Sequence, residues 1–222
     1  IKSSAASDVY KRQLLIICAS VVGATVSAFA YSDTDNSSYK SSIDELSQLG
    51  IINGFEDGTF KPQENVTRAQ AATMFAAALG YSDTKYKNIA TDNAVFSDFT
   101  MSHWAYKYAD YIMRSADIVS GEINCILNGF EDGTFRPDNN VTIIQLLKMA
   151  ICSLGEDGYM AEAVENGGYP NGYNTVAEKY GFSKSIAVDD INQPATREQT
   201  AQIISNTINI PVSYTHLTLP TT

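Results

Sequence analysis

The chain has 222 residues, of which 44% are hydrophobic and 10% aromatic, so it can build a folded core and is not an intrinsically disordered protein. Fifteen basic against 25 acidic side chains give a formal net charge of −10, which repels a polyphosphate and argues against a nucleic-acid partner. Two histidines and three cysteines are too few and too scattered for a zinc cluster or a disulfide framework, so we expect no metal and no cofactor.

The N-terminal segment has the features of an export signal. An apolar run over residues 13–30 follows a lysine and an arginine and ends on the small-large-small sequence AFA, which signal peptidase reads. A membrane-spanning helix is the alternative, but the run is short for one and is interrupted by polar residues. Cleavage would leave a secreted chain that starts near Tyr31 and has no membrane span.

Both ends of the chain differ in character from the rest. Residues 1–12 contain no methionine, and residues 212–222 continue no helical or strand periodicity. They resemble translated adapter sequence, and we expect them to be foreign to the fold. Residues 31–212 hold 12 lysines and arginines against 24 aspartates and glutamates, so the exported part is more acidic than the whole chain.

An identical repeat organises the exported part. NGFEDGTF at residues 53–60 recurs at residues 128–135, and the register continues through the proline and the N-V-T that follow each copy. Beyond each copy, apolar residues at spacings i, i+3, i+4 and i+7 predict a helix that ends near Gly80 or Gly155. These apolar positions are Ala72, Phe75, Ala76 and Leu79 in the first copy, and Leu147, Ala150, Ile151 and Leu154 in the second. Large and small residues exchange between the copies, which favours helices that interdigitate in one core.

Each predicted helix begins with a capping box, in which a threonine hydroxyl and a glutamine side chain bind each other's backbone amides. The boxes are T-R-A-Q at 67–70, T-I-I-Q at 142–145 and T-R-E-Q at 196–199. Apolar residues with helical spacing also follow the third box. Three units are therefore expected, although the third has lost its glycine-rich stretch.

A further helical pattern precedes the capping box of each unit, over residues 42–47, 102–117 and 174–180. The order in each unit is then helix, turn, helix, and a repeat of this size must pack on its neighbours. About eight residues are inserted in the second unit around 120–127. Cys125 lies in this insertion and Cys152 on the next helix, so a disulfide and two separate thiols both remain open.

These motifs resemble the S-layer homology domain. The second unit carries the family pattern as F-S-D at 96–98, H-W-A at 103–105, GFEDGTFRP at 129–137 and V-T at 141–142. The first unit, from Tyr39, lacks the F-x-D and Trp-Ala entry but keeps the glycine-rich turn and V-T-R-A-Q. The third unit keeps two helices and T-R-E-Q.

The resemblance implies a mainly α fold in which three helix-turn-helix units form a pseudo-threefold bundle with a degenerate third unit. The expected divisions are unit 1 at 31–80, a linker at 81–94, unit 2 at 95–157 and unit 3 at 158–211.

The resemblance also implies anchoring at the bacterial cell surface, by grooves between units that bind a secondary cell-wall polysaccharide, often acidic and pyruvylated. Such a ligand needs a guanidinium for its carboxylate, an aromatic face for its sugar ring and backbone amides for its hydroxyls. Arg68 and Arg197, at two helix starts, are candidates for the first role, and Trp104 for the second. The remaining candidates, from the F-x-D entry, the turns and the residues after them, are Asp98, Gly54, Asp57, Gly58, Lys61, Asp132, Gly133 and Arg136.

Structural interpretations stand beside these. The aspartates belong to Asp-Gly turns, Trp104 is equally suited to a core, and the arginines could be exposed first residues of helices. Ile143 occupies the position that matches Arg68 and Arg197, so we expect one or two of the three grooves to work at most.

Two other function classes remain open. One is a structural module that binds surface-layer neighbours and no glycan; the other is the anchor of an exported enzyme whose catalytic domain lies outside this chain. The sequence itself offers no catalytic constellation, because His103 is explained by the repeat and His216 lies in the terminal tail. This chain is therefore predicted not to be an enzyme.

Overall fold

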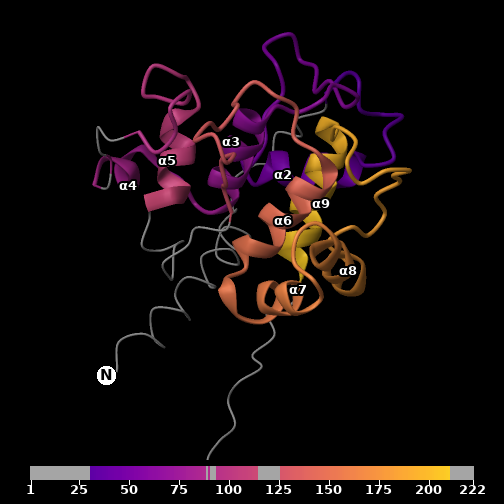
Figure 1. Ribbon diagram of the computed structural model, residues 1–222. Coiled ribbons are helices and arrows are strands. Elements are labelled where there is room, and N and C mark those ends of the chain that lie inside the picture. Colours follow the sequence, from indigo (N-terminus) through magenta and orange to yellow (C-terminus); the bar gives the residue numbers. More distant parts are fainter. Residues whose placement is uncertain (1–30, 89, 91–93, 115–125, 211–222) are drawn as a thin grey trace, which may run out of the picture.

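The computed structural model describes residues 31–88, 90, 94–114 and 126–210, and within them the regular structure is helical, with isolated bridges in place of strands (Figure 1). The predicted mainly α fold is confirmed. The helical elements are α2 (Lys40–Gln48), α3 (Arg68–Ala78), α4 (Asp83–Lys87), α5 (Tyr106–Arg114), α6 (Ile143–Ser153), the π turn η1 (Glu156–Met160), α7 (Ala161–Glu165), α8 (Asn171–Tyr180) and α9 (Arg197–Asn209). In the described part of the chain, no helix has the length and apolar character needed to cross a membrane. The predicted signal peptide and both end segments lie outside the described residues.

The three longest helices, α3, α6 and α9, begin at the predicted capping boxes. In each, the threonine hydroxyl accepts the amide of the glutamine three residues on, and the glutamine side chain accepts the threonine amide. The pairs are Thr67 with Gln70, Thr142 with Gln145 and Thr196 with Gln199. Just beyond the ends of α3 and α6, Gly80 and Gly155 have φ of 79° and 104°, as expected for the residue after a helix C-cap.

Backbone hydrogen bonds join the three helix starts in a closed ring. The amide of Val66 donates to the carbonyl of Ala195, that of Ala195 to Val141, and that of Val141 to Val66, each at 2.9 Å. The first amide of each long helix then donates to the loop of another unit, Arg68 to Asn139, Ile143 to Gln193 and Arg197 to Glu64. These bonds satisfy helix-terminal amides that have no partner within the helix. Each long helix is therefore fixed at its start by a neighbouring unit.

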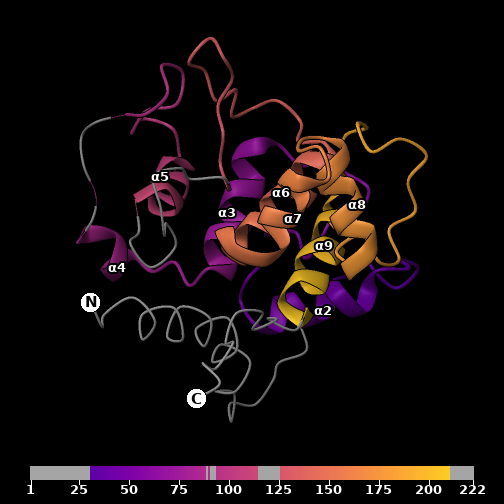
Figure 2. The same ribbon diagram turned by 60° about the horizontal axis from the view of Figure 1, so that its bottom comes forward.

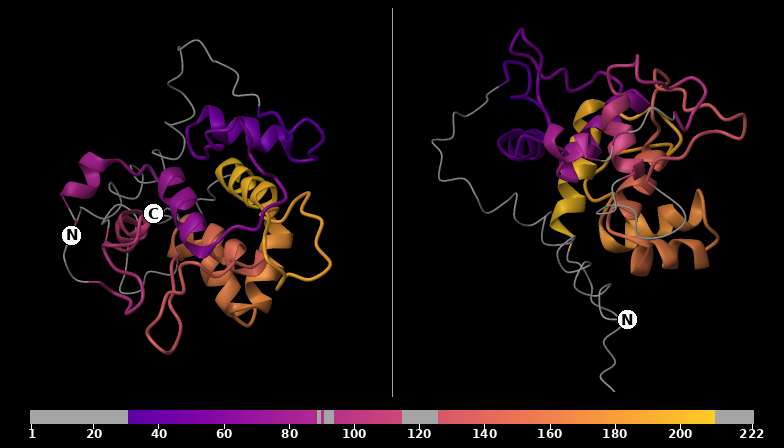
Figure 3. Two further views of the ribbon diagram at one scale, coloured as in Figure 1. Left: turned by 90° about the horizontal axis from the view of Figure 1, so that it is seen from above. Right: turned by 90° about the vertical axis from the view of Figure 1, so that its left-hand side faces the viewer.

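The shorter helices lie outside the long ones. α2 packs on α9, α5 on α3, and α8 on α6, while α9 contacts α6 and α3 at the centre (Figures 2 and 3). Each short helix thus has its main helix contact with the long helix of a different unit. A unit read along the sequence is not a separate hairpin, which agrees with a repeat too small to bury its own apolar face.

The core lies where these helices meet. Ala72 and Phe75 of α3 and their counterparts Leu147 and Ala150 of α6 are all at most 2% exposed. The exchange of large and small side chains seen in the sequence therefore lies in the interior.

The helices differ from the sequence prediction at two places. The helix expected over 102–117 is α5, which begins at Tyr106 because turns occupy the residues just before it. η1 and α7 were not predicted, because Gly155 and Gly158, both with positive φ, interrupt the apolar periodicity there. Cys125 lies outside the described residues, so its pairing with the buried Cys152 stays a prediction.

Candidate functional site

The repeated sequence forms two equivalent turns, turn 1 (residues 53–60) and turn 2 (residues 128–135). Asp57 accepts the amide and the hydroxyl of Thr59 at 3.0 and 2.6 Å, and Asp132 accepts those of Thr134 at 3.0 and 2.5 Å. These bonds lower the pKa of Asp57, and together with Arg136 they lower the pKa of Asp132 to about 2. Both predicted site aspartates are thus engaged within their own turns.

The glycines of the turns have two distinct structural roles. Gly58 and Gly133 have φ of 79° and 78°, a conformation that favours glycine. Gly54 and Gly129 instead allow a ring to approach, since a Cβ on either would lie 2.3 Å from an aromatic carbon. The amide of Gly54 already donates to the Tyr31 hydroxyl at 3.0 Å, so its predicted role as a donor to a sugar hydroxyl is wrong in this structure.

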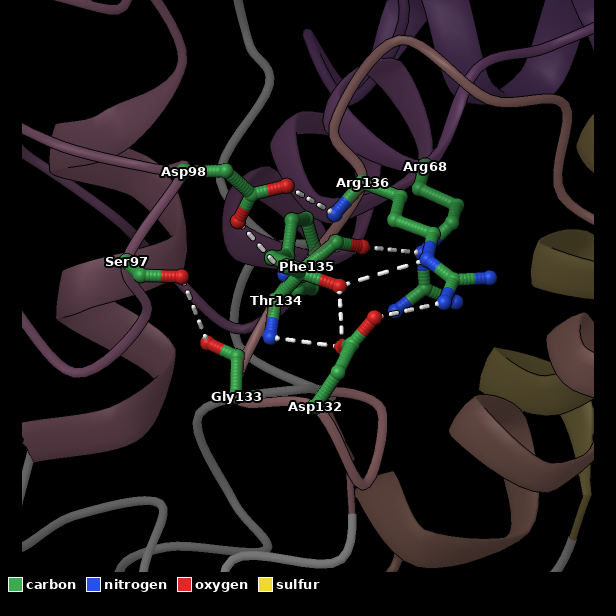
Figure 4. A network of polar contacts seen from close by, with 8 residues as sticks. All are labelled: Arg68, Ser97, Asp98, Asp132, Gly133, Thr134, Phe135 and Arg136. Atoms are coloured by element: carbon green, nitrogen blue, oxygen red, sulfur yellow. Dashed lines mark hydrogen bonds and ion pairs between the residues drawn. The ribbon is translucent and has the colours of Figure 1, made fainter.

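An acidic side chain holds each turn from outside. Asp98 accepts the amides of Phe135 and Arg136 at 2.7 and 2.8 Å (Figure 4). Asp33 accepts the two equivalent amides after turn 1, at 2.8 and 2.7 Å. Asp98 therefore has a structural partner set, and Asp33 has the same one.

The first unit does contain an entry of the F-x-D type, which corrects the sequence prediction. Tyr31 takes the place of the phenylalanine, and its ring centroid lies 5.3 Å from that of Phe60, as Phe96 lies 5.2 Å from Phe135. The tyrosine hid the match in the sequence. The first unit therefore starts near Tyr31.

This equivalence predicts equal effects of two substitutions. Asp98→Ala and Asp33→Ala each leave two turn amides without their carboxylate acceptor, so each is expected to lower the free energy of unfolding by about 1–2 kcal/mol. Asp35→Ala is the control, because the Asp35 side chain is 81% exposed and binds only Lys40 at 3.8 Å. The measurement is urea denaturation, and a loss for Asp98→Ala alone would contradict the assignment of Asp33.

Arg68, the first residue of α3, reaches into turn 2 (Figure 4). Its Nε donates to the carbonyl of Phe135 and its Nη2 to that of Asn128, both at 2.7 Å. Its guanidinium carbon lies 4.5 Å from the centroid of the Phe135 ring. One side chain therefore holds both ends of turn 2.

Arg197, the first residue of α9, does the same for turn 1. Its Nε donates to the carbonyl of Phe60 at 2.7 Å and its Nη2 to that of Asn53 at 3.0 Å. Arg197 is only 5% exposed and Arg68 is partly buried. The interpretation of these arginines as simple exposed helix residues is therefore wrong.

Burial lowers the pKa of both arginines, that of Arg68 to about 10, so both guanidinium groups stay charged at neutral pH. A guanidinium has five N–H groups, and turn 2 uses two of those on Arg68. Within the described part of the chain, no carboxylate forms an ion pair with Arg68. Three N–H groups of a partly buried cation thus remain for a ligand.

A pocket of about 250 Å³ opens beside Arg68. Its walls combine the guanidinium with an ammonium group, two side-chain amides and three aromatic rings, from Lys148, Asn128, Gln145, Phe130, Phe135 and Tyr169. Tyr169 and Lys148 were missed from the sequence, because one lies in the degenerate unit and the other on a helix face read as ordinary surface. Tyr169 stands two residues before α8, as Trp104 stands two residues before α5, and this spacing could have identified it.

The other predicted residues surround the turns. Arg136 lies over the ring of Phe130 at 3.8 Å and binds Asp132 at 2.8 Å, and Lys61 lies over the ring of Phe55 at 4.2 Å. Trp104 is 58% exposed, so it is not a core anchor. Trp104 does not line the pocket beside Arg68. No group of His, Cys, Asp and Glu side chains within the described ranges is placed to hold a metal ion.

The third interface lacks both parts of the arrangement. Ile143 begins α6 where Arg68 and Arg197 begin α3 and α9, and its amide binds Gln193, in the unit without a glycine-rich turn. The missing arginine and the missing turn therefore belong to one interface. Two interfaces, at Arg68 and at Arg197, keep both parts.

Comparison with known proteins gives matches of one kind. The model of the S-layer homology domain matches residues 30–72 and 124–142. Similar proteins include the middle cell wall protein of Brevibacillus brevis, 23% identical over 90% of this chain and 18% of that protein, and the cellulosome-anchoring protein of Acetivibrio thermocellus, 35% identical over 41% of this chain and 18% of that protein. An endoglucanase of a Bacillus species is 27% identical over 86% of this chain and 20% of its own length. The chain thus spans at most a fifth of each of these relatives.

Proposed function

The chain carries an S-layer homology domain, and from that premise we propose that it is a non-catalytic module that anchors a protein to the bacterial cell surface by binding an acidic secondary cell-wall polysaccharide. The ring of hydrogen bonds between helix starts supports an arrangement of three units, the third degenerate, around one pseudo-threefold axis. Ligands would then lie in the grooves between units.

The observation that carries the proposal is the partly buried, unneutralised guanidinium of Arg68 in a pocket with aromatic walls. The Nε of Arg68 is bound to the carbonyl of Phe135, so a carboxylate would approach the other end, where both terminal nitrogens keep N–H groups. This end-on contact is bidentate and selects a planar anion. The exposed ring of Tyr169 offers a face for the attached sugar.

The groove at Arg197 is the second site of the proposal. By the same arrangement of units, Trp104 before α5 corresponds to Tyr169 before α8, and we place it beside turn 1 as the aromatic face of this groove. The interface at Ile143 is proposed to bind no glycan.

Local charge has to overcome the field of the whole protein. The formal net charge of −10 repels an anionic polymer at long range, but its effect is screened beyond about 8 Å at physiological ionic strength. Inside the pocket the partly desolvated guanidinium interacts more strongly than an exposed one would. The anion is therefore recognised by Arg68 at short range.

Retention on cell-wall sacculi tests the proposal. The protein is expected to sediment with sacculi that keep their secondary polysaccharide and to stay in solution after acid extraction of that polymer. Equal retention on extracted sacculi would contradict glycan binding and would favour the surface-layer module that binds protein neighbours.

A further inference from the structure

The pocket beside Arg68 contains a second cation that the groove at Arg197 lacks. Lys148 of α6 donates from Nζ to the side-chain oxygen of Asn128 at 2.9 Å, while Arg68 binds the backbone oxygen of the same residue at 2.7 Å. Asn128 therefore fixes both cations at the rim of turn 2. Its two oxygens are neutral, so it orders the cations without cancelling their charge.

The equivalent position in the other groove is uncharged. Thr73 of α3 corresponds to Lys148 in the repeat, and its hydroxyl donates to the carbonyl of Ala69 within its own helix at 3.0 Å. Asn53 still accepts from Arg197 there, so the clamp on the turn is the same. The two grooves thus share one guanidinium but differ by one ammonium group.

We propose that the pocket between Arg68 and Lys148 selects a saccharide with two anionic groups, whereas the groove at Arg197 binds one anionic group. The proposal rests on the proposed glycan binding and adds the charge of the ligand. The guanidinium suits a planar carboxylate, and the ammonium group, a compact point charge, suits a second carboxylate or a phosphate. The ring of Tyr169, on the wall of the same pocket, would cover the sugar between them.

The test compares two probes of known charge. Galacturonic acid carries one carboxylate, and galacturonic acid 1-phosphate carries a carboxylate and a phosphate. By NMR titration at low salt, the whole chain is expected to bind the phosphorylated probe about tenfold more tightly, because the second anion meets Lys148.

Three variants locate the preference. Lys148→Thr copies the other groove and is expected to reduce the preference at the Arg68 pocket to within about twofold, while Thr73→Lys should create a preference at the Arg197 groove. Lys107→Thr removes the same charge from a side chain that pairs with Asp83 outside the pocket, so it should leave the preference unchanged.

An unchanged preference in Lys148→Thr would overturn the proposal, as would a wild-type protein that binds both probes equally or neither. Retention of the wild-type protein on sacculi is measured in parallel. If retention depends on the polymer while the probe preference fails, the anchoring proposal stands and only the two-anion proposal falls.

Discussion

Replacing Gly129 with alanine is expected to lower the free energy of unfolding by about 3 kcal/mol. The added Cβ would lie 2.3 Å from the ring of Phe96 and 2.8 Å from the carbonyl oxygen of Thr134. The ring cannot retreat, because it is buried against Phe135, and the carbonyl is part of turn 2 itself. Overpacking of this kind typically costs about 1–3 kcal/mol, and contact with backbone places this site at the upper end.

Gly133→Ala is the matched control in the same turn. Its φ of 78° strains any other residue, but no atom lies within 4 Å of the added Cβ, so only about 1 kcal/mol is expected. Urea denaturation of both variants measures the difference. Equal losses would show that backbone conformation alone, and not the approach of Phe96, requires glycine at 129.

Replacing Arg68 with alanine is expected to weaken binding to sacculi about 10- to 100-fold, which corresponds to about 1–3 kcal/mol for a charged hydrogen bond left unmade. The same change frees the carbonyls of Asn128 and Phe135, so part of the loss reflects a loosened turn 2. Arg68→Lys keeps the charge but cannot bind both carbonyls and a carboxylate at once, so it should also bind more weakly.

Two further variants separate recognition from folding. Tyr169→Ala touches the pocket without touching the clamp, so it should weaken binding and leave the free energy of unfolding nearly unchanged. Lys107→Ala removes one positive charge outside the pocket and should change neither. Wild-type retention by Arg68→Ala and Tyr169→Ala would place the glycan elsewhere.

Much of the fold could be predicted because its signals are local. A capping box needs only a threonine and a glutamine three residues apart, and all three boxes form as the sequence indicates. The helix faces follow from apolar spacing for the same reason. The order in which short helices pack on long ones could not be derived, because it depends on bonds between units, such as that of Val66 to Ala195.

The candidate site was predictable only in part. Arg68 and Arg197 stand out at helix starts, but their hydrogen bonds to turns about 67 and 137 residues away along the chain depend on tertiary structure. Tyr31 and Tyr169 were missed because each replaces the aromatic residue of a motif with a different one. Substitution of one ring for another preserves packing while it hides the pattern.

The most direct test of the account observes the arginine side chains while the polymer binds. In ¹⁵N-labelled protein, the Nε–H signals of Arg68 and Arg197 are expected to shift on addition of purified wall polysaccharide, while that of Arg114, whose Nε binds Asp110, stays in place. If Arg68 and Arg197 do not shift when the protein is saturated with polymer, the polysaccharide is held elsewhere and the account is wrong.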